Sequence, residues 1–438
     1  MLRMSNVKAT YVGVAQLDRA FGYGPKGRGF ESSRPRLEKH FEFRSAFFGN
    51  EHTLRYFGGT ILEDAKLLLA KKKAGRNFKN TTIQKGYIIY HNRDRVFNGF
   101  SIDNLLSDIH VLRKRYPKIK MPIIINLGQI EFADKLTYVF LEIICYILIK
   151  EYGYPVVVEF KCKHNIWIEG ISSSPLLLLN NTNKKSMYKY LEKFESDIYK
   201  KHYRKVMGKN EDKEDLSKRM DDIAYFLKYL GVNEDCIDEL SEVTIELAGN
   251  AWEHAEAECL IDVDVTEPYL REDTEGRYFG INISVVNFSE KLLGDALKDK
   301  MQNWNGVHTE RYKVVEKAHK NHSNFFDELY TEEDFYNIAS FQHKISGSMR
   351  KDLTGGTGLT KLISSLEKRS DSHRCYLISG NRAVWFYHQY LEYDKEGWLG
   401  FNDENDFLNR RPANGVFTQG TIYMPGTAYN LNFVIKGD

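Results

Sequence analysis

The sequence contains little cysteine. Only 5 of its 438 residues are cysteines, and they are scattered along the chain at Cys145, Cys162, Cys236, Cys259 and Cys375. None of them forms a Cys-x-x-Cys pair or a spacing suited to metal binding, and the odd number argues against a disulfide framework. We therefore expect buried thiols in the reducing environment of the cytoplasm.

Long apolar runs and net charge are also missing. The most apolar stretch, residues 136–149, is too short to span a bilayer and contains Glu142, so it predicts a buried helix. The N-terminus has no apolar signal core. A net charge of +2 gives the whole chain no electrostatic reason to bind nucleic acid or a membrane. We expect a soluble cytoplasmic protein with neither of these as a partner.

The first residues have no periodicity of either a helix or a strand. Over residues 13–36, glycines alternate with arginine and lysine, and a basic nucleic-acid-binding arm is one interpretation. The segment also resembles the peptide that results when a bacterial transfer-RNA gene is translated as coding sequence, which is the interpretation that we prefer. We expect residues 1–50 to be a disordered or spurious tail, and the true start to lie near residue 40 or 50. The resemblance also suggests a bacterial gene near mobile DNA.

Residues 51–180 have the pattern of a small α/β domain. Short apolar runs predict buried strands, and apolar residues at helical spacing predict helices between them. The strands are expected over 86–91, 122–127 and 156–160, and the helices over 102–115 and 136–149. Asp134 precedes the second helix and is expected to cap it. The order strand, helix, strand indicates a βαβ unit.

A helical connector is expected over residues 181–234, followed by a second α/β domain over 235–438. In the second domain, the patterns predict helices over 235–255 and 361–368 and strands over 261–265, 281–285, 375–379, 383–387 and 421–424. An insert over about 294–352 interrupts this domain. The whole chain is therefore predicted to be an α/β protein, an α+β sandwich in which helices cover sheets.

One predicted helix carries a pair of residues suited to phosphate chemistry. Glu246 and Asn250 are four positions apart, so they share one face of the helix. An amide oxygen is a competent Mg²⁺ ligand, and a nearby carboxylate can polarise the water that attacks a γ-phosphate. A solvated glutamate and asparagine are the alternative interpretation.

A glycine-rich turn precedes the predicted helix at 361–368. It contains Gly355, Gly356, Thr357, Gly358 and Leu359. Glycines allow backbone N–H groups to approach phosphate oxygens closely, and the start of a helix favours negative charge. A plain loop is the alternative interpretation of this turn alone.

Taken in order, these segments resemble the GHKL family, which includes histidine kinases, anti-sigma-factor serine kinases and gyrase-like and chaperone-like ATPases. The segment ELAGNAWEHA resembles the family's N-box, GGTGLTKLI its second glycine box, and GTIYMP its last core strand. The resemblance implies ATP and Mg²⁺ as cofactors, Asn250 as the Mg²⁺ ligand and Glu246 as general base. It also implies phosphate contacts from the glycine-rich turn and a contact from Thr421 on the adenine side.

One position departs from the family pattern. The family has an aspartate that binds the adenine amino group after its second strand, and Asn287 stands there in this chain. An asparagine oxygen can still accept a hydrogen bond from that amino group, but without the charge the bond is weaker. The insert that follows occupies the position of the family's ATP lid.

The first domain has a resemblance of its own. The segment IIINLGQIEFADKLTYVFLEII resembles the central strand and following helix of STAS domains, which are partners of anti-sigma-factor kinases. In those antagonists a phosphorylatable serine follows the aspartate that starts the helix. Here Asp134 is followed by Lys135, which implies that the first domain is structural or a docking surface.

Three functions are compatible with these resemblances. The first is a switch in which ATP binding and slow hydrolysis change contacts with a partner protein. The second is a serine kinase of the anti-sigma type, and the third is a scaffold that keeps the fold without hydrolysis. We favour the switch, in a bacterial regulatory or phage-defence setting and with a partner protein encoded nearby. Whether the chain is an enzyme or forms a homodimer stays open.

Overall fold

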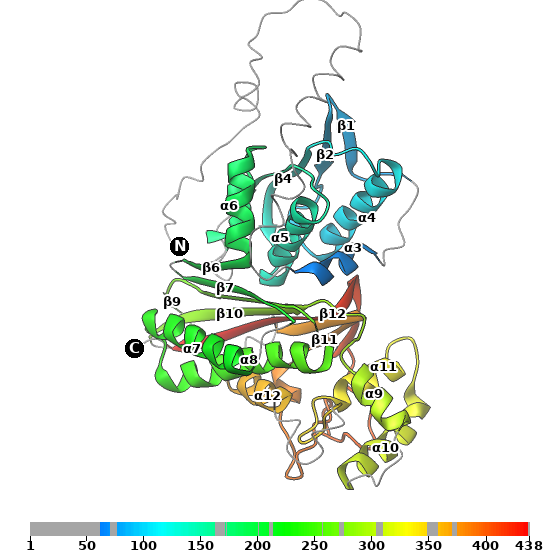
Figure 1. Cartoon of the computed structure of the whole chain (residues 1–438). Coiled ribbons are helices and arrows are strands. Elements are labelled where there is room, and N and C mark those ends of the chain that lie inside the picture. Colours follow the sequence, from blue (N-terminus) through cyan, green and yellow to red (C-terminus); the bar gives the residue numbers. More distant parts are fainter. Residues whose placement is uncertain are drawn as a thin grey trace, which may run out of the picture.

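The computed structural model describes residues 62–70, 77–162, 171, 173–199, 201–209, 213–255, 257–270, 276–303, 310–347, 358–369 and 375–436. Within these ranges the chain is a mixed α/β protein, as predicted, with two sheets and helices between and around them (Figure 1). The expected N-terminal tail over 1–50 lies outside the described residues, and so do Gly355, Gly356 and Thr357.

The first sheet is mainly parallel. Its strands are β1 (Thr81–Gln84), β2 (Tyr87–His91), β3 (Val96–Phe97), β4 (Ile123–Phe132) and β5 (Val156–Cys162). The order is β1-β2-β4-β3, with β5 also paired to β4, and only the β1–β2 hairpin is antiparallel. The three strands predicted in this region are confirmed, and β4 extends beyond its predicted end.

Two long helices cover one face of this sheet. Helix α4 (Gly99–Arg115) begins with a capping box in which Asn98 and Ser101 each accept a backbone hydrogen bond. Helix α5 (Lys135–Lys150) begins at Asp134, whose carboxylate accepts from the Thr137 N–H at 2.8 Å. The predicted cap at Asp134 is therefore confirmed. A short 3₁₀ turn (Glu63–Lys66) and helix α3 (Leu67–Ala70) pack beside them.

The second sheet is antiparallel throughout. Its strands are β6 (Ser196–Tyr199), β7 (His202–Met207), β8 (Cys259–Val265), β9 (Tyr269–Leu270), β10 (Arg277–Asn287), β11 (Tyr376–Trp385) and β12 (Phe417–Lys436). The order is β11-β12-β10-β8-β7-β6, with β9 paired to β10. The strands predicted at 375–379 and 383–387 form one strand, β11, whose register shifts at Gly380 in the left-handed conformation (φ 57°).

The region between the two predicted domains differs from the expected helical connector. Helices α6 (Lys184–Glu195) and α7 (Lys213–Tyr229) are present, but the β6–β7 hairpin lies between them and extends the second sheet. The hairpin escaped prediction because β7 alternates the buried polar residues His202 and Arg204 with the apolar Tyr203. From the sequence alone, charged residues at these positions predict a solvent-exposed segment, because the buried partners of the charges are not visible.

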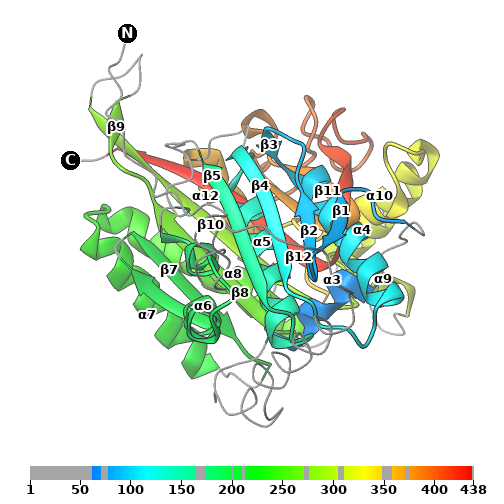
Figure 2. The same cartoon turned by 90° about the horizontal axis from the view of Figure 1, so that it is seen from above.

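The two sheets and their helices form alternating layers (Figures 1 and 2). Helices α7, α8 (Glu234–Ala255) and α12 (Gly358–Arg369) cover one face of the second sheet, while α4 and α5 lie between its other face and the first sheet. Every residue of α5 from Lys135 to Ile149 is buried. One apolar cluster joins the first sheet, α5 and the face of the second sheet that is opposite to α7, α8 and α12, so the two predicted domains share a core.

In its described residues, the predicted insert contains the α-helices α9 (Asp295–Gln302), α10 (Glu310–His322) and α11 (Glu332–Ala339). A buried ion pair fixes it to β11, because Arg382 donates to both carboxylate oxygens of Asp334 at 2.8 and 2.7 Å. The segment between β11 and β12 includes a 3₁₀ turn (His388–Tyr390) and packs on the same core. None of the described helices is long and apolar enough to cross a membrane.

Candidate functional site

Helix α8 presents Glu246 and Asn250 on its C-terminal half. The neighbouring Leu247, Ala248 and Ala251 are buried against the second sheet, which leaves the two polar residues half-buried at the edge of the contact. Neither side chain has a hydrogen-bond partner among the residues that the structure describes. The helix therefore offers a carboxylate and an amide, one turn apart, to a ligand beside the sheet.

The start of α12 lies toward the same half of α8. Lys361 forms an ion pair with Glu242, and Arg369 Nε lies 3.4 Å from Glu239 Oε2. Arg369 is at the end of α12 and pairs with Glu239, whereas Lys361 is near the start of α12 and pairs with Glu242, which is closer to the C-terminal half of α8. The two helices therefore run in opposite directions. The start of α12, where the first backbone N–H groups of a helix have no partner within the helix itself, is therefore on the side of Glu246.

Only part of the predicted glycine-rich turn belongs to the described chain. Gly358 is the first residue of α12, and Leu359 follows it with its side chain packed against the core below the helices. The Leu359 backbone N–H is among the first in the helix, so it has no partner within the helix itself.

The C-terminal end of β10 brings Asn287 to this part of the molecule. Asn287 is paired with Cys259 at the start of β8, the strand that follows directly from α8. Asn287 is 7% exposed. Successive side chains of a strand point to opposite faces, and the preceding Val286 packs in the core shared with the first sheet, so the Asn287 side chain lies on the face covered by α7, α8 and α12. No described residue is a hydrogen-bond partner of the Asn287 amide, which is left with both a donor and an acceptor.

Two further polar residues continue a row across the sheet from Asn287. Thr427 on β12 is its direct cross-strand partner, and Ser379 on β11 is the partner of Thr427, with the two hydroxyl oxygens 3.4 Å apart. Ser379 donates to the Gly426 carbonyl at 2.8 Å and accepts from the Leu293 N–H at 3.0 Å. The sequence pattern missed this row because only the strand register brings its members together.

Thr421 is not part of this row. Its hydroxyl fills the space where a Cβ on Gly99 would lie, so it packs against the start of α4. The contact with Gly99, and not the face of the sheet, separates Thr421 from the row, and Thr421 also precedes Thr427 by six positions on β12, or roughly 20 Å along a strand. The structure therefore brings Thr427, and not Thr421, next to Asn287.

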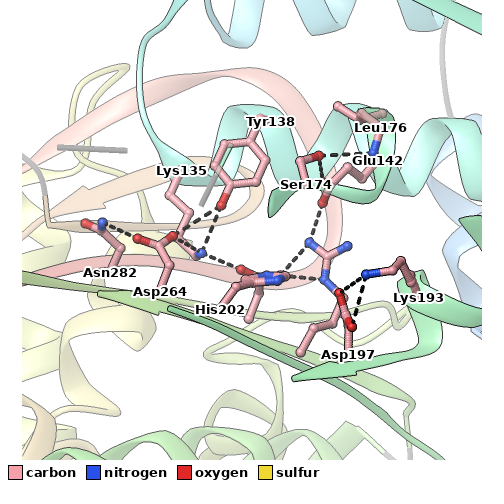
Figure 3. Close-up of polar contacts among 12 residues, drawn as sticks. Lys135, Tyr138, Glu142, Ser174, Leu176, Lys193, Asp197, His202, Asp264 and Asn282 are labelled. Carbon is pink, nitrogen blue, oxygen red and sulfur yellow. Dashed lines mark hydrogen bonds and ion pairs between the residues drawn. The ribbon is translucent and has the colours of Figure 1, made fainter. Parts of the chain in front are cut away.

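A buried charge network lies on the opposite face of the same strands (Figure 3). The Lys135 ammonium lies between Asp262 and Asp264, and Tyr138 donates to Asp264 at 3.2 Å. Asp264 also accepts from the Asn282 amide at 2.7 Å. Lys135 thus docks the start of α5 onto the second sheet within the same chain.

A second basic residue extends this network toward β7. Arg204 forms ion pairs with Glu142 of α5 and with Asp262, and His202 Nε2 lies 2.9 Å from Asp262. Burial alone would raise the pKa of Asp262, but Arg204, His202 and Lys135 together hold it well below its usual value. Burial raises the pKa of Glu142, and Arg204 opposes that effect. The sequence showed Lys135 only as the residue that follows Asp134, and it gave no sign of this network, which only the folded sheet brings together.

Within the described residues, no group of three or more histidine, cysteine or acidic side chains is arranged to hold a metal ion. No known protein family, curated protein or solved structure matches the chain.

Proposed function

We propose that the chain is a nucleotide-dependent switch that binds ATP with Mg²⁺ between α8, α12 and the end of β10. One observation carries the proposal. The half-buried pair Glu246 and Asn250, the start of α12 and the row from Asn287 to Ser379 all lie at one end of the helix-covered sheet face. Carboxylate, amide and free backbone N–H groups are the groups that a magnesium–triphosphate needs.

Each residue has a distinct task in this proposal. The start of α12 binds phosphate oxygens, and the Asn250 carbonyl oxygen holds Mg²⁺, which supplies positive charge at the phosphates. Glu246, one turn away on the same face, orients a water and accepts its proton. Asn287 and Thr427 bind the polar edge of the base.

The insert is the part of the chain that responds to the nucleotide. It begins just after Asn287, and the Leu293 N–H bonds directly to Ser379 in the polar row. A ligand bound at the polar row therefore contacts the segment that leads into the insert. A small shift of Leu293 would reposition helices α9 to α11. These helices would carry the contact with a partner protein, for which one encoded nearby is the first candidate.

Titration with labelled ATP, with and without Mg²⁺, together with phosphate release, tests the proposal. We expect Asn250→Ala to lower Mg²⁺-dependent affinity at least about tenfold, or about 1.4 kcal/mol. Glu246→Ala should keep the affinity within about twofold and slow phosphate release by about 100-fold or more. Asp238→Ala, on an exposed position of the same helix, is the matched control and should change neither quantity.

Unchanged affinity in Asn250→Ala would show that the nucleotide, if bound, lies elsewhere. The scaffold is the second candidate, and the neutral Asn287 favours it because a weaker base contact suits binding without turnover. ATP binding that requires Asn250, with no phosphate release from the unaltered protein, would select the scaffold over the switch with hydrolysis.

A further inference from the structure

Helix α11 of the insert contains a buried amide that has no hydrogen-bond partner in the part of the chain that the structure describes. Asn337 is 1% exposed, and neither its Oδ1 nor its Nδ2 atom has a partner among the described residues. Buried amides in proteins nearly always form hydrogen bonds, because an unsatisfied buried donor or acceptor destabilises the fold. A buried polar side chain that lowers the stability of the fold in this way is typical of a binding site.

A carboxylate lies one turn earlier on the same face of α11. Glu333 precedes Asn337 by four positions, and its Oε1 atom is buried and also lacks a hydrogen-bond partner among the described residues. A Cβ built on Gly380 would be 3.0 Å from this oxygen. The carboxylate therefore lies over the bulge of β11, next to Ser379.

The Glu333 carboxylate and the backbone of Asn337 lie near the polar row. The α11 backbone at Tyr336 and Asn337 lies so close to Gly294 that a Cβ there would be 3.0 Å or less from it. The residue before Gly294, Leu293, bonds to Ser379, and Ser379 is linked through Thr427 to Asn287. A continuous set of contacts thus joins α11 to the base end of the proposed nucleotide site.

We propose that Asn337 and Glu333 recognise the 6-amino group of adenine and thereby supply the selectivity that Asn287 alone lacks. The inference rests on the proposed function. An asparagine can accept from the adenine amino group and donate to a neighbouring ring nitrogen, and the carboxylate accepts the second hydrogen of that amino group. In inosine the 6-position and the neighbouring N7 are both acceptors, so the amide can pair with only one of them in either orientation, and the carboxylate has no donor to bind.

Inosine triphosphate is the probe, because it replaces the amino group by an oxygen and keeps the triphosphate. We expect the unaltered protein to bind ATP with Mg²⁺ at least about tenfold more tightly than inosine triphosphate. Asn337→Leu should weaken the binding of ATP but not that of inosine triphosphate, so the preference for ATP should fall by about tenfold. Glu333→Gln should reduce it by about threefold, since a neutral acceptor replaces a charged one. Asn324→Leu, on the exposed surface of the insert, is the matched control.

Stability gives a readout that a structural role would not reproduce. Because leucine removes an unsatisfied buried amide, Asn337→Leu should raise the Tm of the nucleotide-free protein by about 1–3 °C. An unchanged ratio of the two affinities, together with a lowered Tm, would show that the amide is structural and overturn the inference. If Asn250→Ala abolishes binding while the ratio stays constant in Asn337→Leu and Glu333→Gln, the proposed function stands and only this inference fails. If the unaltered protein binds neither nucleotide, both fail.

Discussion

Glu258 is a single carboxylate that joins distant parts of the chain. It precedes β8, is only 6% exposed, and accepts a hydrogen bond from the Asp64 N–H at 3.1 Å. Burial raises its pKa from 4.5 to about 7, and the neighbouring carboxylates of Asp64 and Glu63 act in the same direction, while Lys209 opposes them. The folded protein therefore keeps this group neutral over a pH range in which the unfolded chain ionises it.

This difference predicts a pH-dependent stability. As the pH rises from about 4.5 to about 7, the unfolded state loses the proton and the folded state keeps it, so the free energy of unfolding should fall by up to about 3 kcal/mol. Glu258→Gln should remove this loss and be more stable than the unaltered protein at pH 8. Urea unfolding at pH 5 and pH 8 measures the effect. Equal gains from Glu234→Gln, on an exposed position, would contradict the assignment to Glu258.

The sequence indicated individual residues where their roles depend on neighbours in the sequence, such as residues one helical turn apart. Glu246 and Asn250 were found because their helical spacing is visible in the sequence, and Asp134 because a cap precedes its own helix. Thr421 was named from the resemblance of GTIYMP to a family strand, and only the strand pairing shows that Thr427 is the threonine beside Asn287. Asn337 and Glu333 gave no signal, since the lack of partners appears only after folding.

Strand β12 depends on one glycine where it crosses the end of β10. Gly426 has a φ of 92°, a conformation that favours glycine, and a Cβ there would overlap the Asn287 carbonyl oxygen. Its own carbonyl accepts from Ser379. The close approach of the two strands at the polar row therefore requires the absence of a side chain at this position.

Gly426→Ala should consequently affect both stability and binding. We expect the free energy of unfolding to fall by about 2–4 kcal/mol, because backbone strain and steric overlap add together. ATP affinity should fall as well, since the overlap displaces Asn287. Gly231→Ala is the matched control, because Gly231 has a φ of 78° but open space around its Cβ position, and it should cost only about 1 kcal/mol. Equal losses in the two variants would show that the close approach is unimportant.

Elements with a strong local pattern were predicted well. Helices α4, α5, α8 and α12 were expected within a few residues of their bounds because each has an apolar stripe or a fully apolar sequence. The β6–β7 hairpin and helices α9 to α11 were not, because their apolar residues are few and their charges are satisfied by distant partners such as the Asp334–Arg382 pair. Tertiary pairing decided these elements, and a local pattern could not.

At the scale of the whole molecule, α5 is an inner layer shared by two sheets. Its Lys135 and Glu142 reach the second sheet through ion pairs, while its apolar residues belong to the core beneath the first sheet. The sequence predicted separate domains because it shows each segment's own pattern and not the surface against which that segment packs. Because the core is shared, we expect the described parts of both predicted domains to unfold as one cooperative unit.

A single substitution at this interface should destabilise both sheets together. Lys135→Met leaves Asp262 and Asp264 buried without its ammonium, and we expect a loss of about 3–5 kcal/mol in the free energy of unfolding. Amide hydrogen exchange should then accelerate to the same extent in β4 and β10. Adding Asp264→Asn should cost less than the sum of the two single changes, because it removes one unpaired charge.

Lys228→Met is the control for this experiment, since its ion pair with Glu234 is exposed and should contribute at most about 1 kcal/mol. Faster exchange confined to β10, with β4 unchanged, would show that the two sheets unfold independently.

The position of α5 also constrains how such a chain can be inherited. A helix buried on both sides must match two sheets that are encoded far apart in the gene, and its charges match side chains on β7 and β8. Recombination that exchanged only the segment up to β5 would pair α5 with a foreign set of aspartates and arginine. We expect the two halves to descend together, with Lys135, Glu142 and their partners changing in concert or not at all.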